Sequence, residues 1–291
     1  MELIEMPQEY LLPKSDLIFK KIFGDENNID ILSAFLQSVL DIPAEEYAEV
    51  TLLDTHFKTE SENDKLGILD VKVRTKSGKI IDVEIQLRNM PYMRERLIFY
   101  LSKMISEQIK SGESYKAIKK SVIIVITDYK MINDSDKYHN VYTMRDENGR
   151  QFSDLIEINT LELPKLPCDD DKSDLWTWMK FLNSKNEEEF KMVETKSKSL
   201  EKAVCVLKRL SADEITKLEY DAREKARLDH ENMIQGSFDM GKIEGKIEDV
   251  ISVIRNLHVS LERTMEILNI SVDYKQEIIK LLQEKGIEYE D

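Results

Sequence analysis

The sequence predicts an α/β domain over residues 1–165, followed by an all-helical C-terminal extension over 196–291. In the first range, helix-spaced apolar residues alternate with strand-like runs, and "SVIIVIT" at 121–127 is short and apolar enough for a buried central strand. The segment "PKLPCDDDKSD", 164–174, has two prolines and three consecutive Asp and is the best candidate for a domain boundary. The pattern beyond it is helical, so we expect 166–195 to be a linker with short helices.

The composition is that of an ordinary globular protein. Hydrophobic residues make up 41% of the 291, which is enough for a sizeable core. No run of about 18 apolar residues occurs, and the start "MELIEMPQEYLLPKSD" lacks the features of a signal peptide, so we expect a cytoplasmic protein without a membrane span. Cys168 and Cys205 have no CxxC spacing, which argues against a structural zinc site or a redox motif.

The charge is strongly acidic but uneven along the chain. A net charge of −15 is unfavourable for binding nucleic acid, because contacts to the phosphate backbone depend on Lys and Arg. Residues 1–131 carry a net charge of −4, whereas residues 132–291 carry −11. The first half can therefore still hold a basic patch around an acidic site.

Three helices are predicted in the first domain. The first begins after a cap at Ser15 or Asp16, because the apolar residues that follow recur near helical spacing: Leu17, Phe19, Ile22 and Phe23. Gly24 and "DENN" interrupt it before a second helix that Pro43 ends. A longer helix is predicted over 91–111, with a proline in its first turn and a glycine just after its end.

Six segments carry strand signals. Four are strong and lie at 49–57, 67–75, 79–87 and 121–127. Two weaker ones, at 139–145 and 154–163, are expected to extend the sheet. With the helices, they give the order helix, three-stranded meander, helix, strand.

A helical seam occupies the last part of the chain. From Met233 onward, apolar residues recur at alternating spacings of three and four, at Met240, Ile243, Ile247, Val250, Ile254 and Leu257. This is the a/d pattern of a coiled coil, although glycines at 236, 241 and 245 each lower the helix propensity by roughly 1 kcal/mol. Two interpretations stay open: the seam forms a homodimer, or the helix packs on its own domain.

The segment 260–282 predicts two short helices broken at 269–271. Such a pair resembles a helix-turn-helix. The start of its second helix, "VDYKQE", is not basic, so we favour a plain helical hairpin over a DNA-reading one.

The stretch "GILDVKVRTKSGKIIDVEIQLR", 67–88, predicts a β-hairpin with two alternative registers. A two-residue turn at Ser77 and Gly78 would mix apolar and acidic side chains on both faces of the hairpin. A three-residue loop that ends in a left-handed Gly78 places Asp70 opposite Glu84 and separates the faces cleanly. This second register is our prediction. It also pairs Lys72 with Asp82, Val71 with Val83, and Val73 with Ile81.

Opposed carboxylates at Asp70 and Glu84 repel one another across a hairpin. Either one of them takes up a proton, or a divalent cation lies between them. Oxygen ligands at this density suit Mg²⁺ or Mn²⁺, and Gln86 on the same strand face could orient a water or a phosphate oxygen beside the ion. The alternative is a solvent-facing hairpin whose acidic groups pair with Lys72 and Arg74.

An Asp in "ILDV", a short turn and Glu-x-Gln in "VEIQ" resemble the PD-(D/E)XK nuclease motif, with Gln86 where its commonest form has Lys. Further blocks narrow the resemblance: "SDLIFKKIFGDENNIDILSAFL" at 15–36, "RERLIFYLSKMISEQIKSGESY" at 94–115 and "SVIIVITDY" at 121–129. In this order they resemble the Rpn family of recombination-promoting nucleases, also described as PD-(D/E)XK nuclease family transposases.

The resemblance implies a restriction-endonuclease-like core, with a mixed sheet flanked by helices. It also implies metal-dependent hydrolysis of DNA phosphodiester bonds, with links to recombination, transposition or phage defence. At the matching positions, Asp70 and Glu84 would be ligands of Mg²⁺ or Mn²⁺, and Gln86 would take the third catalytic position.

Four further residues receive roles from the same resemblance. Asp16 would supply an outer carboxylate and Lys20 would contact phosphate. Arg96 and Tyr100 share a helix face at i and i+4, and would contact phosphate or support the metal ligands. Each of the four is equally well explained as a capping, ion-pairing or packing residue.

The leading hypothesis is a Mg²⁺-dependent DNA endonuclease that forms a homodimer through its C-terminal helices. A neutral amide at Gln86 can orient the attacking water but cannot help to deprotonate it, so weak or conditional activity is expected. The rival hypothesis is a catalytically inactive module that keeps the fold and binds DNA or protein.

Overall fold

The computed structural model describes residues 10–40, 42–57 and 68–290. The chain forms two compact units that divide after Tyr220. The start expected for the second strand, at residue 67, lies outside the described residues. No helix among the described residues is both long enough and apolar enough to cross a membrane.

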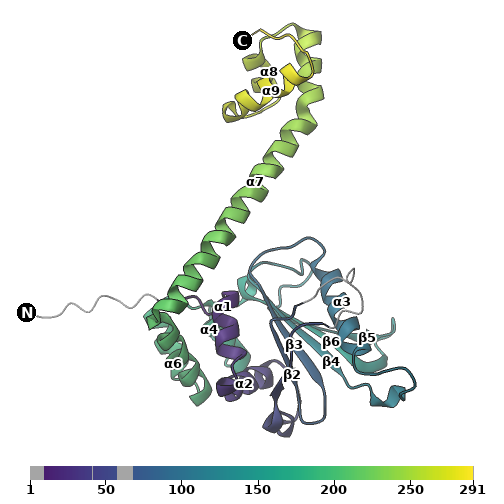
Figure 1. Cartoon of the computed structure of the whole chain (residues 1–291), viewed down its shortest axis with the longest axis vertical. Coiled ribbons are helices and arrows are strands. Elements are labelled where there is room, and N and C mark those ends of the chain that lie inside the picture. The colour runs from purple at the N-terminus through teal and green to yellow at the C-terminus, as the bar shows by residue number, and fades with distance from the viewer. Residues whose placement is uncertain (1–9, 41, 58–67, 291) are drawn as a thin grey trace, which may run out of the picture. The chain divides into compact units, whose positions relative to one another are not determined.

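The first unit is built on a mixed six-stranded sheet in the order β1-β2-β3-β4-β6-β5 (Figure 1). Its strands are β1 Thr51–Leu52, β2 Val71–Arg74, β3 Ile80–Gln86, β4 Ser121–Thr127, β5 His139–Arg145 and β6 Gln151–Glu162. The neighbours β3, β4 and β6 run parallel, and the outer pairs are antiparallel. The carboxyl ends of the three parallel strands therefore meet at one edge of the sheet.

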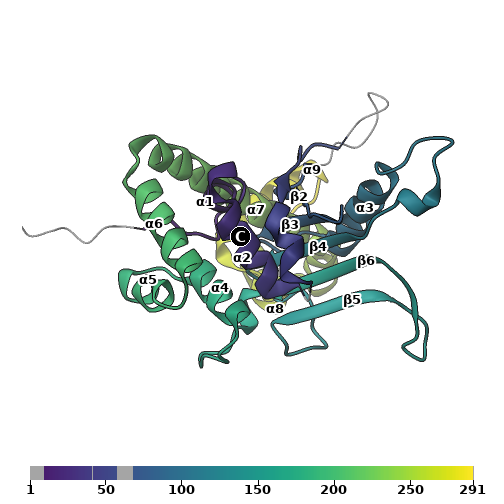
Figure 2. The ribbon, with the colours of Figure 1, turned by 90° about the horizontal axis from the view of Figure 1, so that it is seen from below.

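Helices cover both faces of this sheet (Figure 2). One face packs on α1 Asp16–Phe23 and α2 Ile29–Val39, and the other packs on α3 Met93–Ser106. Because alternate residues of a strand point to opposite faces, Val71 and Val83 join the core under α1 and α2. Ile80, Asp82 and Glu84 consequently point to the α3 face.

The predicted elements are mostly found, with shifted ends. The Ser15 side chain caps α1 by accepting a hydrogen bond from the Ile18 amide, and the helix ends at Gly24 as expected. The second helix ends at Val39, before Pro43. The strand expected at 49–57 is reduced to the two residues of β1, followed by an isolated bridge between His56 and Ile68.

The first unit extends beyond the boundary expected at residue 165. The helices α4 Asp174–Asn183, α5 Glu187–Glu194 and α6 Lys198–Ala212 pack into the same core as α1 and α2. Trp178 of α4 lies 6.0 Å from both Phe23 and Phe35, measured between ring centroids. The segment expected to be a linker thus supplies buried aromatic side chains to the α/β domain, and this burial explains its helical conformation.

The second unit is helical, as expected. The helix α7 Glu214–Leu257 enters it and is followed by α8 Leu261–Ile267 and α9 Lys275–Glu284, so the two short helices are confirmed. Three residues of the predicted seam, Ile247, Val250 and Ile254, are buried against α8 and α9.

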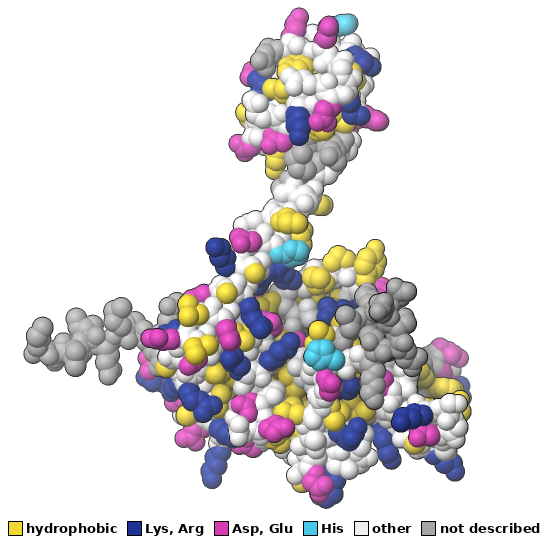
Figure 3. Space-filling model, in the orientation of Figure 1, with side chains coloured by type: hydrophobic (Ala, Val, Ile, Leu, Met, Phe, Trp, Pro, Cys, Tyr) yellow, Lys and Arg dark blue, Asp and Glu magenta, His cyan; other side chains and the backbone are white. Residues whose placement is uncertain are grey.

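This part of the seam therefore packs within its own unit, which agrees with the interpretation that the helix packs on its own domain. Met233 and Leu257 stay exposed, and the side chains of Met240 and Ile243 lie outside the description. Leu228 and Ile234 of α7 are also exposed. Figure 3 shows hydrophobic side chains on the surface of this helix.

Candidate active site

The β2–β3 hairpin has the predicted register. Val71 pairs with Val83, Lys72 with Asp82 and Val73 with Ile81. The loop has three residues, and Gly78 ends it in the left-handed conformation with φ +90°. Hydrogen bonds from the Thr75 amide to the Lys79 carbonyl, 3.0 Å, and from the Gly78 amide to the Thr75 carbonyl, 2.9 Å, close the turn.

Asp70, which directly precedes β2, lies against Glu84 of β3. The Asp70 amide donates to Glu84 Oε1 at 3.2 Å, and Asp70 Oδ2 accepts from the amide of Ile85 at 2.9 Å. The Glu84 side chain is fully buried, whereas 12% of the Asp70 side chain is exposed. The acidic pair is thus reached from solvent on its Asp70 side.

Lys20 of α1 forms an ion pair with this acidic pair. Its Nζ lies 2.8 Å from Asp70 Oδ1, and 38% of its side chain is exposed. Asp16 is exposed in the first turn of the same helix, four residues before Lys20, so the two side chains share a helix face. The structure therefore places Lys20 at Asp70, while a role for Asp16 as an outer carboxylate stays a prediction.

Burial makes the charges of this site costly. Burial and, to a smaller extent, the nearby Asp70 carboxylate raise the pKa of Glu84 from 4.5 to about 7, while Arg96 opposes both. The pKa of Asp82 is also raised, mainly by burial and then by Glu84 and Asp70.

Asp82 is the residue that the sequence reasoning missed. It lies opposite Lys72 in the predicted register, but the Lys72 ammonium lies 3.4 Å from Glu107 Oε2 and 5.3 Å from the Phe57 ring centroid. Within the described part of the chain, neither carboxylate oxygen of Asp82 has a hydrogen-bond partner. The available signal was an Asp on the same strand face as Glu84, two residues before it.

Arg96 and Tyr100 of α3 lie beside the acidic groups. Arg96 Nε donates to the Tyr100 hydroxyl at 2.7 Å, and the guanidinium lies 5.0 Å from the centroid of the Tyr100 ring. Burial raises the pKa of Tyr100, and Arg96 lowers the pKa values of both Glu84 and Asp82. This pair thus contributes the positive charge of α3 to the site.

Gln86 continues the strand face of Glu84 and donates to Glu84 Oε2 at 3.4 Å. It is half-buried at the end of β3. In the parallel sheet it lies beside Thr127, which in turn lies beside Glu162. These three residues form a polar row at the carboxyl edge of the parallel strands, and only Gln86 was singled out from the sequence.

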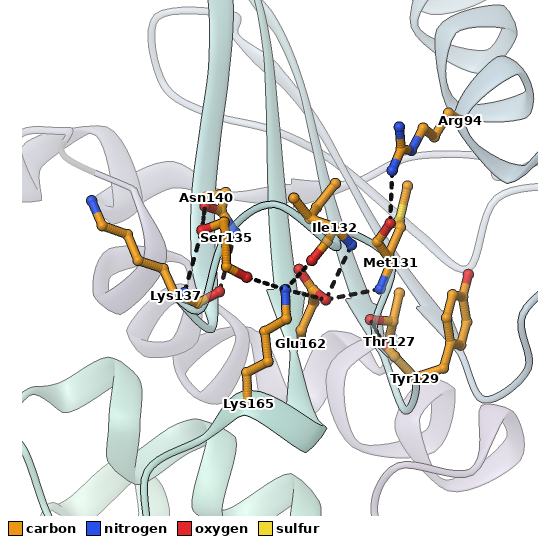
Figure 4. Close-up of polar contacts among 10 residues, drawn as sticks. All are labelled: Arg94, Thr127, Tyr129, Met131, Ile132, Ser135, Lys137, Asn140, Glu162 and Lys165. Atoms are coloured by element: carbon orange, nitrogen blue, oxygen red, sulfur yellow. Dashed lines mark hydrogen bonds and ion pairs between the residues drawn. The ribbon is translucent and has the colours of Figure 1, made fainter.

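Glu162 fixes the loop that follows β4 (Figure 4). Its Oε2 accepts from the amides of Met131, 2.8 Å, and Ile132, 3.3 Å, and lies 2.9 Å from Lys165 Nζ. Lys165 also donates to the carbonyls of Ile132 and Ser135. The buried pair of Glu162 and Lys165 thus holds this loop at the edge of the sheet.

Two further buried oxygens near this edge lack hydrogen-bond partners among the described residues. They are Glu162 Oε1 and the hydroxyl of Tyr129. Burial raises the pKa of Tyr129, and Glu162 raises it further while Arg96 lowers it. Unpaired buried polar groups are uncommon and often mark functional sites.

The carboxylates fit a hard divalent cation. Among residues 10–40, 42–57 and 68–290, no three or more His, Cys, Asp or Glu side chains form a ready ligand cluster. Mg²⁺, however, is usually held by one or two carboxylates with waters and substrate phosphates as the remaining ligands. Asp70 and Glu84 supply that donor set, and the unpartnered oxygens of Asp82 add negative charge beside it.

Comparison with known proteins agrees with this chemistry. A family model described as PD-(D/E)XK nuclease family transposase matches residues 13–237 of the 291. The match extends past residue 165 and includes α4 to α6, which pack into the α/β core. Comparisons with curated proteins and with solved structures gave no match. The family match indicates a nuclease- or transposase-related role.

Proposed function

The chain belongs to the PD-(D/E)XK nuclease family transposases, and from this premise we propose that it hydrolyses phosphodiester bonds of DNA as a divalent-metal-dependent endonuclease. One observation carries the proposal: Asp70 and Glu84 meet across the hairpin, with an amide of one bound to the carboxylate of the other at 3.2 Å. Glu84 points to the α3 face of the sheet, whereas the Asp70 carboxylate contacts Lys20 of α1 and is partly exposed to solvent.

Asp70 and Glu84 are proposed as the ligands of Mg²⁺ or Mn²⁺. When bound, such an ion lowers the pKa of a coordinated water and stabilises charge on phosphate oxygens. The protein itself holds Asp70 through Lys20 and the amide of Ile85, which fixes the orientation of this carboxylate.

Gln86, Lys20 and Arg96 complete the proposed site. The amide group of Gln86 donates to Glu84 and can orient a water, but it cannot accept a proton from that water at neutral pH. The ammonium group of Lys20 lies 2.8 Å from Asp70 Oδ1 and is partly exposed, which supports a contact with a phosphate oxygen. Arg96 reduces the net negative charge near Glu84. Weak activity is expected from this set.

Plasmid nicking tests the proposal. The parent chain is expected to nick supercoiled plasmid with Mg²⁺ or Mn²⁺ and not with a chelator. Asp70→Asn and Glu84→Gln should each lower the rate by at least about a hundredfold, since they remove a proposed ligand charge. Asp169→Asn is a matched control, because Asp169 is exposed and far along the chain from the hairpin. Activity that survives in the double variant D70N/E84Q would exclude these residues from catalysis.

A second candidate function is a catalytically inactive module of the same fold. Two observations favour it: the Glu84 side chain is fully buried, and a neutral Gln86 stands where the commonest motif has Lys. Thermal unfolding discriminates the two functions. A metal site predicts stabilisation by Mg²⁺ beyond that given by Na⁺ at equal ionic strength, because an ion that binds only the folded state stabilises it. An inactive module predicts none.

A further inference from the structure

A pocket of about 420 Å³ lies on the α3 face of the sheet, at the turn end of the hairpin. Ile80 and Met104 contribute its apolar lining, and the side chains of Arg74, Lys119 and Lys72 contribute most of its positive charge. The pocket is separate from the acidic pair, which lies at the opposite end of β3.

The cations of this pocket outnumber the anions that neutralise them. Lys72 is paired with Glu107 at 3.4 Å, and the other lining acid, Asp54, lies 3.0 Å from His56. Among the described residues, no hydrogen bond or ion pair engages the guanidinium of Arg74 or the ammonium of Lys119. Both side chains belong to exposed residues. An anion in the pocket would therefore meet two cations that have no competing partner among the described residues.

The backbone at Lys119 is held in place. Gln108 Oε1 accepts from the Lys119 amide at 2.7 Å, and Gln108 Nε2 donates to the Lys119 carbonyl at 3.1 Å. The stem of Lys119 packs against the hairpin turn, so that a Cβ at Gly78 would lie 3.3 Å from its Cγ. The backbone and stem of Lys119 are thus held beside the pocket by the turn on one side and by Gln108, which follows α3, on the other.

Local composition supports an anionic ligand. Residues 103–120 contain five Lys and two Glu, in a chain whose net charge is −15. The positive charge is therefore concentrated beside this pocket while the rest of the chain is acidic. Such a local excess of cations is typical of a surface that contacts phosphates.

The register of the hairpin sets the distance from the pocket to the acidic pair. Arg74 pairs with Ile80, which lies four residues before Glu84 on the same strand face. At about 3.3 Å per residue, the two points are about 13 Å apart.

We propose that the pocket at Arg74 and Lys119 binds a backbone phosphate of DNA, about 13 Å along the hairpin from the phosphodiester at Asp70 and Glu84. The choice of DNA rests on the proposed function. The pocket would hold the backbone along the hairpin and set the direction in which the strand crosses the acidic pair. Contacts of this kind position a nucleic acid without reading its sequence.

Fluorescence anisotropy with a short labelled duplex in EDTA tests this proposal without cleavage. The double variant R74Q/K119Q of the full chain should bind at least about tenfold more weakly at low salt. The slope of log K against log salt should decrease in magnitude by about one, because one phosphate contact is lost. R209Q/K217Q is the matched control, because Arg209 and Lys217 are exposed on helices outside the hairpin. It should bind as the parent does. Equal unfolding midpoints of all three proteins exclude misfolding as the cause.

The outcomes separate this proposal from the proposed function. Parent-like binding by R74Q/K119Q, or an equal loss in R209Q/K217Q, would overturn the pocket assignment. So would displacement of the duplex by inorganic phosphate at micromolar concentration, because that would identify a site for a small free anion. If the parent does not nick plasmid but binds DNA through Arg74 and Lys119, the endonuclease proposal fails while the pocket assignment stands.

Discussion

Glu84 is a carboxyl group in a place where its ionised form is unfavourable. Its side chain has no exposed surface, Asp70 lies against it, and the buried Asp82 lies two residues away on the same strand face. Arg96 and the amide group of Gln86 offset part of this cost. The residue is therefore held near the balance between protonated and ionised forms, and a bound cation would favour ionisation.

This balance predicts how stability depends on pH. The folded state raises the pKa of Glu84 from 4.5 to about 7, so it binds the proton more tightly than the unfolded chain does. Between these two values the folded state keeps a proton that the unfolded state has lost, and stability falls as the pH rises. The full effect is about 3 kcal/mol, because one pKa unit corresponds to about 1.4 kcal/mol.

Chemical unfolding of the parent and of Glu84→Gln, both with chelator, measures this effect. The stability of E84Q minus that of the parent should increase between pH 4.5 and 7 and then stay constant, since Gln does not titrate. Glu188→Gln, at an exposed position, should show no such trend. A pH-independent difference for E84Q would mean that the Glu84 carboxyl is solvated in the folded state.

At the scale of elements, the hairpin shows what a sequence pattern can determine. Alternation of apolar and acidic residues excluded the two-residue turn, and Gly78 at φ +90° forms the predicted bulge. The pairing of Asp70 with Glu84 followed from the register alone. Asp82 could not be assigned, because pairing with Lys72 across the strands does not reveal that the Lys72 side chain extends to Glu107.

Other parts of the fold were beyond the reach of local patterns. The helices α4 to α6 are amphipathic, but their sequence does not show which core they pack into. The prolines and aspartates of 164–174 indicated a domain boundary before these helices. The link between Glu162 and the loop after β4 joins segments about thirty residues apart and depends on the order of parallel strands. The candidate site was therefore predicted at the hairpin and missed at β6.

The buried pair of Glu162 and Lys165 leads to a prediction for the loop after β4. Only 6% of the Lys165 side chain is exposed and none of Glu162, so Lys165→Met leaves a buried carboxylate without its cation. The expected loss of stability is about 3–5 kcal/mol. Lys191→Met is the matched control, because Lys191 pairs with Glu187 on the surface, where the loss of an ion pair changes stability little.

Hydrogen exchange locates the effect of Lys165→Met within the fold. The amides of Met131 and Ile132 donate to Glu162, so their exchange should accelerate more than that of amides in β4. E162Q/K165M should recover part of the stability, because no buried charge remains. If K165M costs no more than K191M, the pair does not hold the loop.

At the scale of the whole molecule, two compact units differ in how they bury their apolar surface. The first completes its core with α4 to α6, where Trp178 packs on Phe23 and Phe35. The second buries Ile247, Val250 and Ile254 against its own short helices. The N-terminal part of the predicted seam, where Met233 is exposed, remains available for contact with a second copy of the chain. We propose that any self-association uses this part of α7.

Truncation tests both the boundary and the self-association. A chain that ends after Tyr220 keeps the complete first core and should unfold cooperatively, whereas a chain that ends at residue 165 exposes Phe23 and Phe35 and should not. Losing the burial of even one large aromatic side chain costs about 3–5 kcal/mol, a large part of the stability of a typical domain. For the chain that ends after Tyr220, urea unfolding is followed by tryptophan fluorescence and by circular dichroism. For the chain that ends at residue 165, which lacks both tryptophans, it is followed by circular dichroism alone.

Sedimentation of the same proteins measures the role of α7. The full chain is expected to sediment as a dimer and the chain that ends after Tyr220 as a monomer, because the truncation removes Met233 and all later seam residues. Met233→Glu in the full chain should weaken the dimer, since it places a charge in an apolar seam, while Val272→Glu, at an exposed residue outside α7, should not. A dimer that persists after removal of the second unit would place the association surface on the α/β unit and leave the exposed part of α7 for another partner.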